Sequence, residues 1–112
     1  MKTKSAKAKG RKLQNLVVEK LRKTYPELED DDIKAQIMGV SGEDVVFSPL
    51  AKRLIGLSFE CKNQERLNLW DSLEQAANNC EDRTPILVFK RNRSDVYAAI
   101  PFEFLIKLLS NN

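Results

Sequence analysis

The feature that most constrains the fold is the strict polar–apolar alternation of the segment Leu-Ser-Phe-Glu-Cys-Lys at positions 57–62. In an extended strand, every second side chain points to the same face of the sheet. Leu57, Phe59 and Cys61 would therefore line one face, whereas Ser58, Glu60 and Lys62 would line the other. The alternation predicts a strand with a buried apolar face and two opposite charges together on its other face.

Apolar periodicity and turn residues predict the elements around this strand. Ser48 and Pro49 are suited to the N-cap and first position of a helical turn, which Gly56 ends. The other predicted elements are a helix from Leu13 to about Tyr25, extended segments at 37–40 and 44–47, a helix at 66–79, strands at 86–90 and 95–100, and a helix that opens with Pro101 at its first position and carries the apolar residues from Phe102 to Leu109. This order predicts an α/β fold with a central mixed sheet of four to five strands flanked by helices.

The length and composition fit one domain. The chain has 112 residues, of which 42% are hydrophobic, so it can bury one core. Residues 1–9 are expected to be a flexible basic arm, and residues 10–112 a single domain. No apolar run is long enough to span a bilayer, and no secretory signal is recognisable, so we expect a cytoplasmic protein without a membrane partner. Cys61 and Cys80 are accordingly expected to be free thiols.

The charge is unevenly distributed along the chain. Residues 1–23 contain nine basic residues and one acidic residue, a charge of +8, although the net charge of the whole chain is only +3. A basic segment on an otherwise acidic chain suggests a polyanionic partner such as DNA. The alternative is a segment that only improves solubility.

The absence of histidine restricts the chemistry that the chain can perform. Ser-His-Asp triads, Cys-His nucleophiles and the common zinc sites are excluded. Carboxylates remain, and they are suited to holding a hard divalent cation such as Mg²⁺ or Mn²⁺. Asp44 and Glu60 are the candidate metal ligands, with the backbone carbonyl of Cys61 as a third. Lys62 would position the attacking water or stabilise the transition state of phosphodiester hydrolysis.

A Glu-x-Lys pattern alone is common, and Glu60 and Lys62 could simply form a salt bridge. Two features favour a catalytic role. Asp44 begins an extended segment, and the spacing of 16 positions would allow two adjacent antiparallel strands to bring it beside Glu60. The basic N-terminal segment supplies a reason for a phosphate-containing substrate.

Gly42-Glu43-Asp44, followed after fifteen residues by Glu60-Cys61-Lys62-Asn63, resembles the motif of the PD-(D/E)XK nuclease superfamily. Within that superfamily the chain is similar to small archaeal-type Holliday junction resolvases and related phage endonucleases. The resemblance extends over roughly residues 9–107 in motif and in element order. It implies a restriction-endonuclease-like sheet, a metal-dependent nuclease activity and a homodimer. The apolar C-terminal helix could supply dimer surface, and the alternative is that it packs on the sheet. Glu43 stands where the motif usually has proline.

The resemblance also implies further site residues. Lys9-Gly10-Arg11-Lys12-Leu13-Gln14 matches the segment that opens the first helix in these resolvases, but Gln14 stands where an acidic metal ligand is expected. Gln14 is preferred by register as the outer ligand, and Glu19 is the acidic alternative. In the helix after Glu-x-Lys, Gln75 matches a polar residue that faces the site. The alternative for Gln75 is a solvent-facing glutamine.

Several other residues are candidates for contacts with DNA. They are basic and lie in the arm, the first helix or predicted turns: Lys7, Lys9, Arg11, Lys12, Lys52, Arg53, Lys90, Arg91 and Arg93. Solvated turns are the competing explanation for those outside the arm and first helix. Trp70 could stack on a base, but its helical spacing with Leu67 and Leu73 favours a place in the core.

These observations predict a metal-dependent DNA endonuclease that is selective for branched DNA, as a Holliday junction resolvase is. Two alternatives remain open. One is a nuclease of the same fold that acts on flaps, single strands or foreign duplex. The other is a nucleic-acid-binding module without catalytic activity, in which Asp44, Glu60 and Lys62 are structural.

Overall fold

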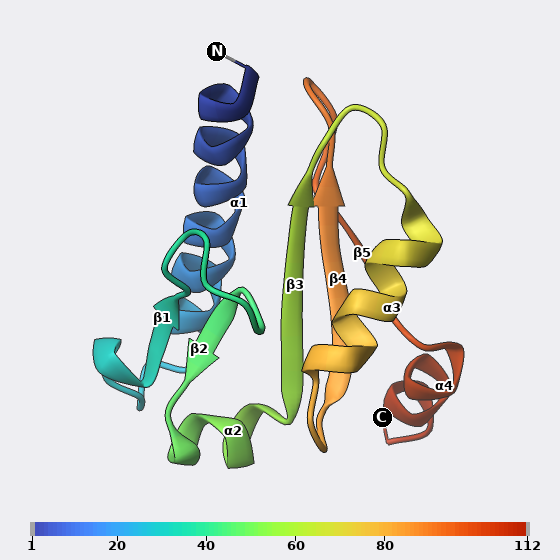
Figure 1. Ribbon diagram of the computed structural model, residues 1–112. Helices are drawn as coiled ribbons and strands as arrows, with labels where there is room; N and C mark the ends of the chain where they lie inside the picture. Colours follow the sequence, from blue (N-terminus) through green and yellow to red (C-terminus); the bar gives the residue numbers. More distant parts are fainter. Residues whose placement is uncertain (1, 112) are drawn as a thin grey trace.

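The computed structural model describes residues 2–111, which form four α-helices, one 3₁₀ turn and five strands (Figure 1). Along the chain these are α1 (Lys2–Thr24), η1 (Asp30–Asp32), β1 (Ile33–Ala35), β2 (Val45–Phe47), α2 (Pro49–Ile55), β3 (Leu57–Asn63), α3 (Leu69–Asn79), β4 (Thr84–Lys90), β5 (Tyr97–Ala99) and α4 (Phe102–Ser110). The predicted α/β class is confirmed. Met1 of the expected arm and Asn112 of the expected domain lie outside the described residues.

The strands form two small sheets instead of the predicted central sheet of four to five strands. β1 and β2 pair antiparallel, while β3 pairs parallel with β4, and β4 pairs antiparallel with β5. The prediction of one central sheet is wrong because β2 does not form a ladder with β3. Within residues 2–111, the backbones of the two sheets share one hydrogen bond, from the Asp44 N–H to the Phe59 carbonyl at 3.0 Å.

The basic N-terminal segment is helical in the structure. α1 begins at Lys2, so residues 2–9 continue the helix rather than forming a separate flexible arm. Alanine and lysine, which favour helix formation, make up most of this segment, and no proline interrupts it. The basic side chains of Lys4, Lys7 and Lys9 therefore lie on a helix surface.

The first strand lies earlier in the chain than the sequence predicts. β1 covers Ile33–Ala35, whereas residues 37–43 form a loop and not an extended strand. Gly39 and Gly42 in this loop have φ values of +89° and +113°, which are incompatible with a regular strand. The burial agrees with this assignment, since Ile33 is completely buried and Ile37 is 74% exposed.

Helices cover both faces of the three-stranded sheet. α1 packs on β3 and on the small sheet, while α3 packs on β3 and β4 (Figure 1). Both faces of β3 are consequently covered, and all four residues from Ser58 to Cys61 are buried, the polar ones as well as the apolar ones. The main core lies between α1, α2 and the two sheets and contains Leu13, Val17, Val18, Ile33, Val45, Phe47, Ala51, Ile55, Phe59, Cys61, Ile86 and Val88.

Local predictions for the remaining elements hold in part. Ser48 caps α2 by accepting a hydrogen bond from the Ala51 N–H, and Gly56 ends that helix with φ +68°. The helix predicted at 66–79 begins instead at Leu69, because the Asn68 side chain caps it by accepting from the Asp71 N–H. Pro101 precedes α4 as its N-cap residue, not as its first helical residue.

Trp70 does not belong to the core, contrary to the prediction. Its position in the first turn of α3 leaves 78% of it exposed, and Ala76 is the buried apolar residue of this helix. The helix rests on the sheet through small side chains, so the large indole points outward. Both cysteines are free thiols as predicted. No helix within residues 2–111 combines the length and the apolar character needed to cross a membrane.

Candidate active site

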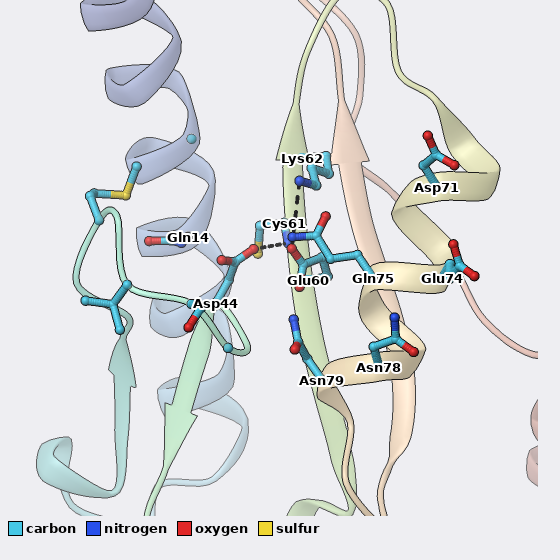
Figure 2. Close-up of a pocket in the computed structure, with 15 residues that line it drawn as sticks. Gln14, Asp44, Glu60, Cys61, Lys62, Asp71, Glu74, Gln75, Asn78 and Asn79 are labelled. Carbon is cyan, nitrogen blue, oxygen red and sulfur yellow. Dashed lines mark hydrogen bonds and ion pairs between the residues drawn. The ribbon is translucent and has the colours of Figure 1, made fainter.

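A cleft of about 480 Å³ lies where α1, the 38–42 loop, β3 and α3 meet (Figure 2). It collects five of the side chains that the sequence predicts for the site, together with the predicted carbonyl ligand of Cys61. The predicted residues that line it are Gln14, Asp44, Glu60, Cys61, Lys62 and Gln75. They come from positions as far apart as 14 and 75, so tertiary folding alone brings them together.

Asp44 immediately precedes β2, and hydrogen bonds of both its backbone and its carboxylate hold it in place. Its N–H donates to the Phe59 carbonyl at 3.0 Å, and its carbonyl accepts from the Gln36 N–H at 2.9 Å. One carboxylate oxygen, Oδ2, accepts from the Cys61 N–H at 2.7 Å. The Asp44 carboxylate thus contacts β3 from the side of the small sheet.

Glu60 projects from β3 toward α3 and is only 3% exposed. The Lys62 ammonium lies on the same face of the strand, 3.9 Å from Glu60 Oε2, as the alternation predicts. This distance is at the outer limit of an ion pair, and Glu60 Oε1 has no hydrogen-bond partner. A buried carboxylate oxygen without a partner is unfavourable, so the Lys62 contact alone does not explain why Glu60 is buried.

Burial raises the proton affinity of both carboxyl groups, whereas their contact raises the pKa of Glu60 and lowers that of Asp44. Burial raises the pKa of Glu60 to about 7, and the nearby Asp44 charge adds to this effect, while the Lys62 charge and the nearby Asn79 amide oppose it. Burial also raises the pKa of Asp44, against the opposing effects of the Cys61 N–H, Lys62 and Gln14. Two carboxylates this close in a buried place favour sharing a proton or a cation.

The cleft contains oxygen atoms suited to a hard cation. Gln14 is buried and its Oε1, like Glu60 Oε1, has no partner. The N–H and C=O of a strand residue leave on the same side, so the Cys61 carbonyl points to the edge where its N–H meets Asp44. Two carboxylates, an amide oxygen and a carbonyl fit the ligand preference of Mg²⁺ or Mn²⁺.

Within residues 2–111, no three His, Cys, Asp or Glu side chains converge as a metal-binding group. A cation in the cleft would therefore have two carboxylates, Asp44 and Glu60, and would depend on neutral oxygens for its other protein ligands. The Cys61 thiol would not be among them, because burial raises its pKa and keeps it protonated.

α3 contributes a polar row that sequence reasoning recognised only at Gln75. Asp71, Glu74, Asn78 and Asn79 also line the cleft (Figure 2). Their spacing of three and four residues was the available signal, since it places polar side chains on one face of a helix. Asn79 is the most informative of them because its amide lies close enough to the Glu60 carboxyl group to lower the pKa of that group.

The alternative ligand Glu19 does not line this cleft. It lies at a different cavity, which Lys12 and Lys90 also border. The five-residue separation from Gln14 turns Glu19 to another side of α1. Of the two predicted first-helix candidates, the structure brings only Gln14 to the carboxylates.

The predicted DNA-contacting residues fall into two groups. Lys7, Lys9, Arg11 and Lys12 in the N-terminal half of α1 share one end of the molecule with Lys90, Arg91 and Arg93 at the β4–β5 turn (Figure 1). Lys52 and Arg53 lie in α2 at the opposite end, and Lys52 pairs with Glu81 at 3.1 Å. The first group therefore forms the larger basic surface, and it adjoins the end of β3 that carries Lys62.

No protein-family model matches the chain, and no significantly similar curated protein or solved structure was found.

Proposed function

We propose that this protein is a metal-dependent DNA endonuclease that hydrolyses phosphodiester bonds. The observation that carries the proposal is the meeting of Asp44, Glu60 and Lys62 in one cleft, where buried oxygen atoms lack hydrogen-bond donors. Carboxylates that bind a cation, next to a lysine that contacts a phosphate, form a chemically sufficient set for this reaction.

The side chains have distinct roles in this proposal. Asp44, Glu60, the Cys61 carbonyl and Gln14 would hold Mg²⁺ or Mn²⁺, which acidifies a water molecule and neutralises charge on the phosphate. Lys62 would orient the attacking water or donate to the phosphate oxygens in the transition state. Asn79 would keep the Glu60 carboxyl group in its binding orientation, and Gln75 would contact the substrate or the water from α3.

The substrate that we propose is branched DNA, with a Holliday junction as the most specific form. The basic surface on α1 and the β4–β5 turn would bind phosphates, which accounts for affinity but not for sequence selectivity. We also propose that the protein acts in the cytoplasm as a homodimer. α4 supports this part, because Phe102, Ile106 and Leu109 are exposed apolar residues on a helix without buried residues. A two-fold dimer matches the symmetry of a four-way junction.

The test is cleavage of a synthetic four-way junction by the purified protein in Mg²⁺ or Mn²⁺. We expect symmetric nicks in opposite strands, which disappear in EDTA and in Lys62→Ala. A panel of flap, nicked, single-stranded and linear duplex DNA separates a junction resolvase from another nuclease. Salt-sensitive DNA binding without metal-dependent cleavage of any substrate would contradict the endonuclease proposal and favour a binding module.

Trp70 gives a direct measurement of where DNA binds. It is the sole tryptophan, it is 78% exposed, and it precedes Asp71, which lines the cleft. Stacking on an unpaired base contributes about 1–3 kcal/mol, so Trp70→Ala should weaken binding of branched DNA roughly 5- to 150-fold. We expect the tryptophan emission to be quenched when a four-way junction is titrated into the protein in EDTA.

Anisotropy of labelled DNA provides the control for this measurement. If the labelled junction binds while the emission of Trp70 stays unchanged, the DNA does not reach the start of α3. The same affinity for the wild type and for Trp70→Ala would lead to the same conclusion.

A further inference from the structure

The candidate site lies across the boundary between the two sheets. Asp44 immediately precedes β2 of the small sheet, whereas Glu60, Cys61 and Lys62 belong to β3 of the larger sheet. Among the described residues, the Asp44–Phe59 bond is the single backbone hydrogen bond that joins the two sheets. The distance between the two carboxylates therefore depends on how this boundary is held.

A buried ion pair crosses the boundary next to Asp44. Arg83 lies just before β4, and both of its terminal nitrogens donate to the Glu43 carboxylate, Nη1 to Oε1 at 2.9 Å and Nη2 to Oε2. The side chains are 4% exposed for Arg83 and 12% exposed for Glu43. Such a two-bond contact fixes orientation as well as distance, which a single-point contact does not.

Further contacts hold Arg83 in place on both sides of the boundary. On the larger sheet, Nη1 also donates to the Leu57 carbonyl at 3.3 Å. On the small sheet, the guanidinium lies 5.9 Å from the centre of the Phe47 ring. Ser58 Oγ donates to Glu43 Oε1 at 3.4 Å, so the larger sheet contacts the pair from β3 as well.

The segment before Glu43 offers Asp44 little restraint. Gly42 has φ +113° and Gly39 has φ +89°, and residues 39–42 are exposed. Of the side chains in residues 36–43, that of Glu43 alone forms hydrogen bonds or ion pairs with β3 or Arg83, among the interactions of the described residues. The ion pair is thus the restraint nearest to Asp44 on its N-terminal side.

We propose that the Arg83–Glu43 ion pair sets the position of Asp44 relative to Glu60, so that Arg83 is a positioning residue of the cation site. This inference rests on the proposed function in so far as the site binds a cation. The competing explanation is that the apolar contact across the boundary, such as Phe47 against Phe59 with ring centres 6.1 Å apart, holds the sheets by itself.

The experiment compares the wild type with the double variant Arg83→Met and Glu43→Leu. Removing both charges avoids a buried unpaired charge, which would unfold the protein for an unrelated reason. Glu81→Gln is the matched control, because it removes the exposed partner of Arg83 at 2.9 Å and leaves the Glu43 contact intact. Thermal unfolding of each variant records any general loss of stability.

Two measurements report the position of Asp44. The first is hydrogen exchange of the Cys61 amide by NMR, because this amide donates to Asp44 Oδ2 at 2.7 Å. In the double variant we expect its exchange to accelerate at least about tenfold relative to other β3 and β4 amides. The second is the affinity for Mn²⁺ by calorimetry, which we expect to fall roughly 10- to 100-fold.

Unchanged Cys61 exchange in a folded double variant would overturn the proposal, and so would an equal effect of Glu81→Gln. If the double variant does not fold, Arg83→Lys decides, because it keeps the charge but loses the two-bond contact. Faster Cys61 exchange in Arg83→Lys would then support the proposal, and wild-type exchange would overturn it. A wild type that binds no Mn²⁺ would refute the proposed function, whereas the Cys61 amide would still decide the role of Arg83.

Discussion

Glu60→Gln is expected to abolish metal-dependent cleavage and, at the same time, to make the metal-free protein more stable. The variant removes one of the two carboxylates that the cleft offers to a cation, while its shape and burial stay nearly the same. We expect the cleavage rate of a four-way junction to fall on the order of 10³-fold, which corresponds to about 4 kcal/mol of transition-state stabilisation.

The gain in stability follows from the direction of the pKa shift. Burial raises the pKa of Glu60 from its ordinary value of 4.5 to about 7, so the folded state binds a proton more tightly than the unfolded state does. The free energy of unfolding of the metal-free wild type should therefore fall as the pH rises from about 4.5 to 7, by up to about 3 kcal/mol. Glutamine has no charge to lose, so the part of this decrease that comes from Glu60 should be absent in the variant, and the part that comes from Asp44, whose pKa burial also raises, should remain.

Urea unfolding in EDTA at pH 5 and pH 8 measures this effect. The variant should be similar to the wild type at pH 5 and more stable at pH 8, while Glu27→Gln, at an exposed position outside the cleft, should follow the wild type at both pH values. Asp32 and Glu81 titrate with lowered pKa values, so their effects fall at lower pH. A variant that is less stable than the wild type at pH 8 would show that Glu60 is a structural partner of Lys62.

Ile33→Ala should destabilise the protein far more than the same substitution four residues later. Ile33 is completely buried in the main core and pairs with Phe47 in the small sheet. Removing a buried isoleucine side chain typically costs about 2–5 kcal/mol, which corresponds to roughly 10–25 °C in Tm for a chain of this size. Circular dichroism during heating measures this change.

Ile37→Ala is the matched control for this substitution. Ile37 is 74% exposed in the loop, so we expect its replacement to change stability by less than about 0.5 kcal/mol. The pair also tests the position of the first strand, because the sequence favours a strand at 37–40 and the structure has it at Ile33–Ala35. A larger effect for Ile37→Ala would contradict the structure and support the sequence-based assignment.

The amino-acid sequence determines the elements whose signals are local. The alternation of 57–62 predicts β3, the Ser48-Pro49 pair and Gly56 predict the ends of α2, and the apolar spacing of Leu13 and Val17 predicts the buried side of α1. The positions of Glu60 and Lys62 on one face of a strand follow in the same way. Each of these depends on residues within a few positions of one another, so periodicity and capping are sufficient.

Only the tertiary structure decides the features that depend on distant contacts. Ile33 rather than Ile37 enters the core because two glycines with positive φ turn the 37–43 segment away from the sheet. Trp70 is exposed because α3 approaches the sheet through small residues, which helical spacing alone does not reveal.

The same distinction applies to the candidate site around Glu60 and Lys62. The sequence places Glu60 and Lys62 together, because strand geometry fixes neighbours two positions apart. It does not determine that Gln14, Asp44 and Asn79 meet them, or that Arg83 pairs with Glu43 across two sheets. These residues come from positions as far apart as 14 and 83, and the packing of α1 and α3 on opposite faces of β3 brings the residues of the cleft together.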